Sequence, residues 1–308
     1  MKVAVCILSY KRLDGLRRLL NGLEQLVFAK MPVPTVRVLV IDNDPEAGAR
    51  ACCELLQATY RWPLEWHHEP RRGISHGRNR AIELARERDD FLAFLDDDEV
   101  PEPGWLDHLL DVQSRYGASV VTGPVLPVLG SEAPDWSIQG GFYERPRYPT
   151  GFSMDLARTG NVLLTTALFA SPANRFDERY GLSGGEDTHF FLRIRQQGHR
   201  IVWADEAIVH EWVPASRTTM SWLLQRSYRY GNTYSLCERD LQQGVLTALL
   251  RAAKGIAHIG AGIVLLVPGV FGRRVWLIKS LRSICLGAGM VNGVMGRRYE
   301  EYRQTHGS

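Results

Sequence analysis

The sequence has few of the features that mark several common protein classes. Its five cysteines are scattered over 308 residues without a CxxC pair, so neither a zinc site nor a disulfide framework is predicted. No GxGxxG follows the first apolar run and no GxxxxGKS/T occurs, which argues against a dinucleotide site and a P-loop. The formal net charge of +3 is too small to indicate a nucleic-acid partner.

The N-terminus also lacks the pattern of an export signal. The apolar run at residues 3–8 is too short for the hydrophobic core of a signal peptide, and polar residues follow it at once. Together with the scattered cysteines, this predicts a reduced protein on the cytosolic side. The apolar content of 45% is enough for one large domain or two small ones.

What the sequence does contain is an alternation of apolar strands and amphipathic helices. Residues 91–95 are five apolar residues in a row, typical of a strand buried on both faces. Helices are expected between the strands, with Asp14 and Ser75 as caps. Earlier strands are predicted at residues 3–8, 36–41 and 64–68. This order predicts an α/β fold with a doubly wound, mostly parallel sheet.

Polar residues stand at the carboxyl ends of three predicted strands, at Ser9, Asp42 and Asp96. Because these ends share one edge of a parallel sheet, the side chains should converge on one crevice, where ligands bind in such folds. Residues 96–99 place four consecutive acids there, and buried carboxylates need a neutralising partner. A divalent cation on a phosphorylated ligand would supply one; a solvated acidic turn is the alternative.

A nucleotide suits this crevice. Asp42 or Asn43 can hydrogen-bond the edge of a base, and Arg72 or Arg78 can meet phosphate. The alternative for the two arginines is a solvated helix face. Further along, a helix is expected at residues 105–116, strands at 119–126 and 160–169, and a long connection between those strands.

Two later stretches carry further candidate chemistry. Gly184 and Gly185 precede Glu186 and Asp187, which open a predicted helix. Either acid can be a general base aimed into the crevice, or both can simply complement the helix dipole. A short strand then delivers His210. A lone histidine is more often structural, but with the acids it suits Mn²⁺ or Mg²⁺.

The ordered set of motifs resembles the family 2 inverting glycosyltransferases of GT-A fold. The resemblance covers roughly residues 1–215, and the finer likeness is to bacterial exopolysaccharide enzymes of the succinoglycan β-glucosyltransferase type. It rests on Leu8-Ser9-Tyr10-Lys11-Arg12, Val40-Ile41-Asp42-Asn43-Asp44, Gly73 with Arg78-Asn79, Asp96-Asp97-Asp98, Gly184-Gly185-Glu186-Asp187 and His210-Glu211-Trp212.

The resemblance implies a role for each matched residue. Asp187 matches the general base and Glu186 its neighbour, which helps to orient the acceptor. Asp98, Asp96 and His210 match the groups that hold Mn²⁺ or Mg²⁺. The donor, a nucleotide sugar such as a UDP-sugar, would be bound by Ser9, Tyr10, Arg12, Asp42, Asn43, Gly73, Arg78, Asp96 and Asp97. Many members have two consecutive acids where this chain has Asp42-Asn43, so recognition of the base can fall to either residue, and a base other than uracil stays open.

The implied reaction is direct displacement. A base removes the proton of an acceptor hydroxyl, which attacks from the face opposite the leaving diphosphate, so an α-linked donor gives a β-linked product. Two other functions stay open at this point. A sugar-nucleotide pyrophosphorylase would need a glycine-rich, arginine-bearing loop after the first strand, which residues 9–12 do not supply. A catalytically silent membrane scaffold would be expected to have lost acids that this sequence retains.

The last third, residues 216–308, is predicted to be a helical region that attaches to a membrane. A helix capped by Thr218 or Thr219 precedes two apolar segments, at residues 245–271 and 275–295. Arg273 and Arg274 lie between the segments, and Lys279 and Arg282 follow within the second. Arg297, Arg298 and Arg303 come after the second segment. Basic residues beside apolar helices suit an anionic leaflet. We expect a hairpin at the cytoplasmic face of the plasma membrane that meets a lipid-linked acceptor; a soluble helical subdomain packed on the sheet is the alternative.

Overall fold

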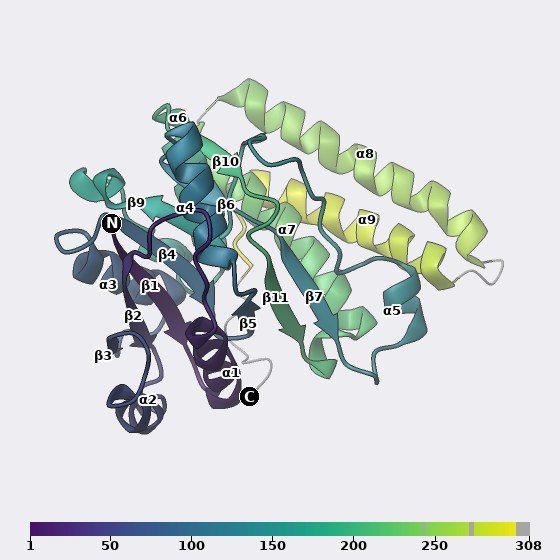
Figure 1. Ribbon diagram of the computed structural model, residues 1–308. Coiled ribbons are helices and arrows are strands. Elements are labelled where there is room, and N and C mark those ends of the chain that lie inside the picture. Colours follow the sequence, from purple (N-terminus) through teal and green to yellow (C-terminus); the bar gives the residue numbers. More distant parts are fainter. Residues whose placement is uncertain (243, 271–273, 300–308) are drawn as a thin grey trace.

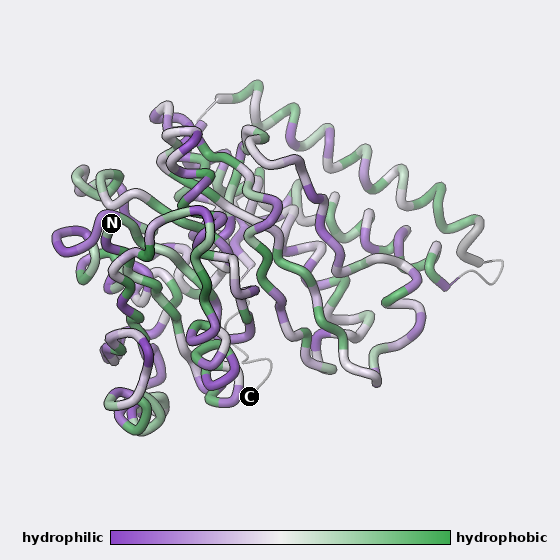
Figure 2. Tube along the Cα trace, in the orientation of Figure 1, coloured by the Kyte–Doolittle hydropathy of each residue, from purple (hydrophilic) through white to green (hydrophobic). Residues whose placement is uncertain are grey.

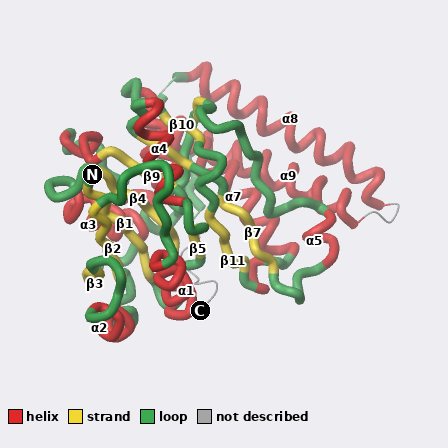
Figure 3. Tube along the Cα trace, in the orientation of Figure 1, coloured by secondary structure: helices red, strands yellow, loops and turns green. Residues whose placement is uncertain are grey.

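The computed structural model of the chain describes residues 1–242, 244–270 and 274–299. Residues up to about 215 form sheets with helices packed on them, and three long helices follow (Figure 1). Figure 3 shows the same division, with strands gathered on one side and long helices on the other. The sequence predictions that involve Phe271, Arg273 and Arg303 lie outside the described residues.

Eight strands form the main sheet, in the order β3-β2-β1-β4-β9-β6-β10-β8. Four parallel strands follow the predicted apolar runs: β1 (Lys2–Ser9), β2 (Thr35–Asp42), β3 (Leu64–His68) and β4 (Phe91–Asp96). In register, Ser9 lies opposite Asp42, and Leu8 lies opposite Asp96. The polar ends of the three strands therefore meet at one edge, as predicted.

The other half of the sheet is mixed. β9 (Val162–Thr165) is antiparallel to both β4 and β6 (Val120–Thr122), while β10 (Ile201–Trp203) is parallel to β6 and antiparallel to β8 (Ser153–Met154). The strand predicted at residues 160–169 is shorter than expected, because the chain enters the 3₁₀ helix η1 (Thr166–Ala170).

The strand predicted at residues 119–126 is a second correction, because it breaks after Thr122. A side chain at Gly123 would collide with the carbonyl oxygens of Ala204 and Ala207, and Pro124 has no N–H for a ladder bond. The chain resumes as β7 (Val125–Leu129) in a second sheet of order β5-β11-β7. Its other strands are β5 (Glu99–Pro101) and β11 (Val209–Val213). The long connection after β7 contains α5 (Asp135–Gln139) and β8.

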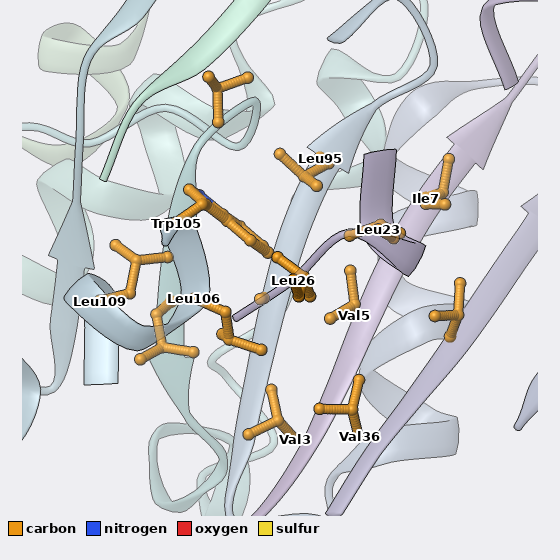
Figure 4. Close-up of a cluster of buried hydrophobic side chains, with 14 of the residues drawn as sticks. Val3, Val5, Ile7, Leu23, Leu26, Val36, Leu95, Trp105, Leu106 and Leu109 are labelled. Carbon is orange, nitrogen blue, oxygen red and sulfur yellow. The ribbon is translucent and has the colours of Figure 1, made fainter. Parts of the chain in front are cut away.

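Helices cover both faces of the parallel strands. Because side chains alternate along β1, Val3 and Val5 join one core cluster and Cys6 joins the other. The first cluster is packed by α1 (Leu13–Glu24), α2 (Arg50–Gln57) and α4 (Trp105–Tyr116). Figure 4 shows Leu23 and Trp105 packed in this cluster. The opposite face is packed by α3 (Ile74–Ala85) and α6 (Glu186–Gln196).

Two of the predicted helix caps are wrong. α1 begins after Arg12, so Asp14 lies within its first turn and is exposed. α3 begins after Gly73, whose φ of +133° favours glycine. Ser75 is therefore inside α3, and its hydroxyl donates to the carbonyl oxygen of Asp177 at 2.9 Å. The cap at Thr219 is confirmed, since its side chain accepts from the backbone N–H of Trp222.

The last third consists of α7 (Met220–Leu241), α8 (Val245–Val270) and α9 (Arg274–Val294). α9 lies between α7 and α8, and glycines allow the backbones to approach closely (Figure 1). A side chain at Gly289 would meet the carbonyl oxygen of Tyr228 on α7, and one at Gly287 would meet that of Gly255 on α8. The three helices therefore form one tightly packed unit.

The outer surface of α8 is apolar and exposed. Large hydrophobic side chains are exposed along the helix. They are Leu246, Leu249, Leu250, Ile256, Ile263, Val264 and Val267. Figure 2 colours much of α8 green, the hydrophobic end of the hydropathy scale. Val245–Val267 is the one stretch of the described residues that is long and apolar enough to cross a membrane, and little of it is buried.

Candidate active site

A cavity of about 1040 Å³ lies at the carboxyl edge of the main sheet. One wall is formed by the ends of β1 and β4, and another by the start of α6. α7, α8 and α9 complete the lining, so the sheet region and the helical region share one cavity. A space of this size is typical of a substrate site rather than of a packing defect.

The acids after β4 line the first wall and are neutralised by arginines. Asp97 accepts hydrogen bonds from the backbone N–H of Tyr10 at 3.1 Å and from Arg12 at 3.0 Å. Asp98 accepts from Arg12 at 2.9 Å and from Arg217 at 3.0 Å. Burial raises the pKa of Asp97 to about 7, although Arg12 lowers it. The negative charge of this acidic wall is therefore partly neutralised by the guanidinium groups of Arg12 and Arg217.

Burial also raises the pKa of Asp96, which Arg78 lowers and Asp98 raises. The pKa of Glu99 is raised by burial and then by Asp96 and Asp98. The Glu99 carboxylate accepts a hydrogen bond from the backbone N–H of Asp96 at 2.8 Å. Crowded carboxylate oxygens of this kind have the chemistry that Mg²⁺ or Mn²⁺ prefers.

The carboxylates do not form a metal site by themselves. Across residues 1–242, 244–270 and 274–299, no group of three or more His, Cys, Asp and Glu side chains is arranged to hold a metal ion. The carboxylate of Asp98 already forms ion pairs with Arg12 and Arg217. A cation here therefore needs further oxygen ligands from a bound molecule.

His210 is not brought to this wall, and its role as a metal ligand stays a prediction. Its Nε2 lies 3.0 Å from Glu102 Oε1, and the residue does not line the cavity. Because side chains alternate along β11, the next residue, Glu211, faces the acids instead and lies opposite Glu99 in register. Glu211 pairs with Arg145 at 3.0 Å.

The two residues predicted to read the base have different positions. Asp42 is buried and does not line the cavity, because its carboxylate accepts from the N–H of Ala49 at 2.9 Å and from the N–H of Asp44 at 3.1 Å. Asn43 does line the cavity, and its Oδ1 accepts from the N–H of Gly73 at 3.0 Å. Ser9 lines the same part, and its buried hydroxyl has no hydrogen-bond partner in the described chain.

Arg78 connects the two acidic parts of the cavity. Its guanidinium group pairs with Glu186 and lies 3.4 Å from Asp96. The side chain is buried and packs over the ring of Phe176, so its position is fixed. The acids after β4 and those at the start of α6 therefore share one cation.

The glycine loop before α6 turns Glu186 and Asp187 in different directions. Gly184 and Gly185 have φ values of +73° and +93°, and Gly185 packs against Thr233 of α7. Glu186 is buried against Arg78, and burial raises its pKa to about 7, although Arg78 lowers it. Asp187 is half-buried, lines the cavity and accepts from the N–H of Thr188 at 2.6 Å. Of the two acids, Asp187 is the more accessible to a substrate.

Several residues of the cavity were not predicted. Glu211 and Arg217 reach it from β11 and the loop that follows. A further set of basic residues reaches it from α7 and its surroundings. That set consists of Arg145, Arg158, Arg226, Arg229, Arg251, Lys254 and Arg282. The helical spacing of Trp222, Arg226 and Tyr230 was the signal that could have revealed the α7 face.

Comparison with known sequences places this site in a family. Residues 4–175 match the profile of Glycosyl transferase family 2. The succinoglycan biosynthesis protein ExoM of Rhizobium meliloti is 36% identical over 283 residues, which is 89% of this chain and 89% of that protein. The glucosyl-dolichyl phosphate glucuronosyltransferase of Haloferax volcanii is 25% identical over 78% of this chain and 77% of its own length.

Solved structures agree on the fold. The mannosyltransferase PcManGT from Pyrobaculum calidifontis, in complex with GDP-Man and Mn²⁺, superposes with a TM-score of 0.63, at 14% identity over 96% of this chain and 87% of that one. S. aureus TarS 1–349 in complex with UDP gives a TM-score of 0.53, at 16% identity over 96% and 92% of the two chains. The chain therefore has the GT-A fold and belongs to glycosyl transferase family 2.

Proposed function

We propose that the chain transfers a hexose from a nucleotide sugar, a UDP-sugar, to a hydroxyl of a lipid-linked saccharide in exopolysaccharide synthesis, with inversion of the anomeric centre. The observation that carries this proposal is the position of Asp187, which faces the same cavity as the acids after β4. Support also comes from the relative named for succinoglycan biosynthesis and from fold neighbours solved with UDP or GDP-Man.

Asp187 is the general base of the proposed reaction. Its carboxylate takes the proton of the acceptor hydroxyl as the hydroxyl oxygen bonds to the anomeric carbon and the bond to the diphosphate oxygen breaks. Glu186 cannot play this part, because it is buried against Arg78. Its role is to hold Arg78, which spans from the start of α6 to Asp96.

The opposite wall binds the donor. Ser9 presents a hydroxyl to the base or ribose, beside Asn43, whose amide is hydrogen-bonded to the backbone of the following loop. Tyr10, Arg12, Gly73 and Asp97 form the surroundings of the diphosphate. Asp98 and Asp96 would hold Mn²⁺ or Mg²⁺ together with the diphosphate oxygens. Such an ion, when bound, neutralises the negative charge that develops on the leaving group.

Residues 216–308 would attach the enzyme to the cytoplasmic face of the plasma membrane. The exposed apolar side of α8 supports this, as does its position on the same cavity as Asp187. A saccharide anchored to lipid at α8 can reach the base without leaving the membrane surface.

The direct test replaces Asp187 by Asn in the full chain. We expect transfer to fall by about 10²- to 10⁴-fold, because the proton acceptor is lost. UDP binding, measured by calorimetry with Mn²⁺, should stay within about twofold, since the wall after β4 is untouched. Transfer is followed from a radiolabelled UDP-hexose into a membrane lipid fraction.

Asp14→Asn is the matched control, because Asp14 also stands in the first turn of a twelve-residue helix but is exposed and does not line the cavity. Either substitution should cost at most about 1 kcal/mol of unfolding free energy through the helix dipole. Transfer that survives Asp187→Asn at the level of Asp14→Asn would remove Asp187 as the base.

A further inference from the structure

The helical side of the cavity is strongly basic. α7 turns one face toward the cavity, with residues at the three- and four-residue spacing of a helix surface. Arg226 and Arg229 lie on this face, Arg158 comes from the loop after β8, and Arg282 comes from α9. We call these four residues the α7 arginine cluster.

Much of this charge has no carboxylate partner. Elsewhere in the cavity several arginines pair with acids, as Arg217 does with Asp98 and Arg251 with Glu238. Within the described part of the chain, no carboxylate lies within 4.0 Å of Arg158, Arg226 or Arg282. These three side chains pack instead over the rings of Tyr230, Trp222 and Phe142, at 5.6, 4.8 and 4.9 Å respectively.

The pKa of the Tyr230 hydroxyl reflects the positive charge of the nearby arginines. Arg226 Nε donates to its hydroxyl oxygen at 2.7 Å. Burial would raise the pKa of Tyr230, but Arg226, Arg158, Arg145 and Arg229 lower it to about 6. The lowering of this pKa by four arginines indicates a positive potential at Tyr230, which favours an anion.

The cluster lies between the proposed base and the apolar helix. Thr233, one turn beyond Tyr230 on α7, packs against Gly185 beside Asp187. On the other side, Lys254 of α8 lines the same cavity, whereas Ile256 is exposed on its surface. An anion at the cluster would therefore sit between the reaction centre and any lipid in contact with α8.

We propose that the α7 arginine cluster binds the diphosphate that joins the saccharide acceptor to its lipid. Guanidinium groups suit phosphate oxygens, and the adjoining apolar face of α8 suits a hydrocarbon chain. The donor diphosphate is served by the opposite wall, where Arg12 accompanies the acids. This inference rests on the proposed function, because it assigns the acceptor of that reaction.

The test measures binding without transfer. Farnesyl diphosphate is titrated into the full chain in neutral detergent micelles, with tryptophan fluorescence as the readout; Trp222 lies beside Arg226. We expect it to bind at least tenfold more tightly than farnesol or inorganic pyrophosphate, because both parts of the ligand are recognised. Arg226→Met and Arg158→Gln should each weaken it by about 10- to 100-fold, as expected for a lost charged hydrogen bond. If one of the two variants does not fold, the other alone still tests the proposal.

A second readout is the absorbance of tyrosinate near 295 nm. Wild type should show one tyrosine ionising near pH 6 that is missing in Tyr230→Phe, and farnesyl diphosphate should move this ionisation to higher pH. Arg80→Met is the control, since Arg80 is exposed on α3 and pairs with Glu83. It should leave both readouts unchanged.

Three results would overturn the proposal. If Arg226→Met weakens UDP binding as much as farnesyl diphosphate binding, the cluster serves the donor. If farnesol binds as tightly as farnesyl diphosphate, the cluster does not recognise the diphosphate. If pyrophosphate binds as tightly as farnesyl diphosphate, the site does not recognise the hydrocarbon chain. Phosphatidylglycerol vesicles that displace farnesyl diphosphate with equal strength would make this a general site for anionic lipid. All of these outcomes are independent of Asp187, so failure here differs from failure of the proposed base.

Discussion

Arg78→Met removes the cation that the two acidic parts of the cavity share, and its effect on stability should depend on pH. Arg78 is 2% exposed and pairs with Glu186, which is 3% exposed. Removing one partner of a buried ion pair costs about 3–5 kcal/mol, because the other charge is left buried. Methionine fills similar space over Phe176, so lost packing contributes little.

The sign of the pH dependence follows from Glu186. Burial raises its pKa in the folded state to about 7, against an ordinary value of 4.5. The folded state therefore holds a proton that the unfolded state has lost between these values, so unfolding free energy falls as pH rises through this window. Without Arg78, which lowers the pKa of Glu186, the fall must extend to higher pH.

Urea unfolding followed by tryptophan fluorescence tests this reasoning. Arg78→Met should lose about 3–5 kcal/mol at pH 8.5 but only about 1–2 kcal/mol at pH 5, where Glu186 is neutral and only hydrogen bonds are missing. Adding Glu186→Gln should recover part of the loss at pH 8.5. The exposed control Arg80→Met should lose less than about 1 kcal/mol at either pH. A loss that is the same at both pH values, or no recovery in the double variant, would refute the argument.

Three further substitutions test other parts of the molecule. Gly185→Ala places a side chain at a φ of +93° against Thr233, so unfolding free energy should fall by about 1–3 kcal/mol and transfer should drop while UDP binding persists; unchanged transfer would contradict it. Asp89→Asn breaks a buried pair with Arg37 at the amino ends of the strands, and should cost about 3–5 kcal/mol in urea without altering UDP affinity. Val264→Glu on the exposed side of α8 should change unfolding free energy by less than about 0.5 kcal/mol yet reduce flotation with liposomes; undiminished flotation would argue against a membrane role for this face.

The parallel half of the fold could be predicted because its signals are local. A buried parallel strand is mostly apolar, and the apolar runs of β1, β2 and β4 each end at a polar residue, Ser9, Asp42 and Asp96. The meeting of Ser9, Asp42 and Asp96 at one edge then follows from parallel pairing alone. Helix starts were harder to predict, because Asp14 and Ser75 have side chains that can cap but are used differently in the tertiary structure.

The orientation of side chains at the site could not be predicted, because the sequence of a short strand does not reveal it. β11 has five residues, so which of His210 and Glu211 faces the cavity depends on its pairing with β5. In the same way, the loop after β2 turns Asp42 toward backbone donors and leaves Asn43 on the cavity. The α7 arginine cluster depends on the packing of three separate segments, which no local pattern specifies.

The arrangement of charges explains why the acids after β4 form no metal site alone. Asp98 is bound by Arg12 and Arg217, so the wall is balanced before any ligand arrives. A diphosphate that enters must compete for these same guanidinium groups, and each one that it captures leaves a carboxylate exposed to its negative charge. Under the proposed function, a cation held by Asp98 together with the diphosphate would offset this repulsion. The proposed function therefore predicts that metal and donor bind together, since the carboxylates of the bare wall are already paired with arginines.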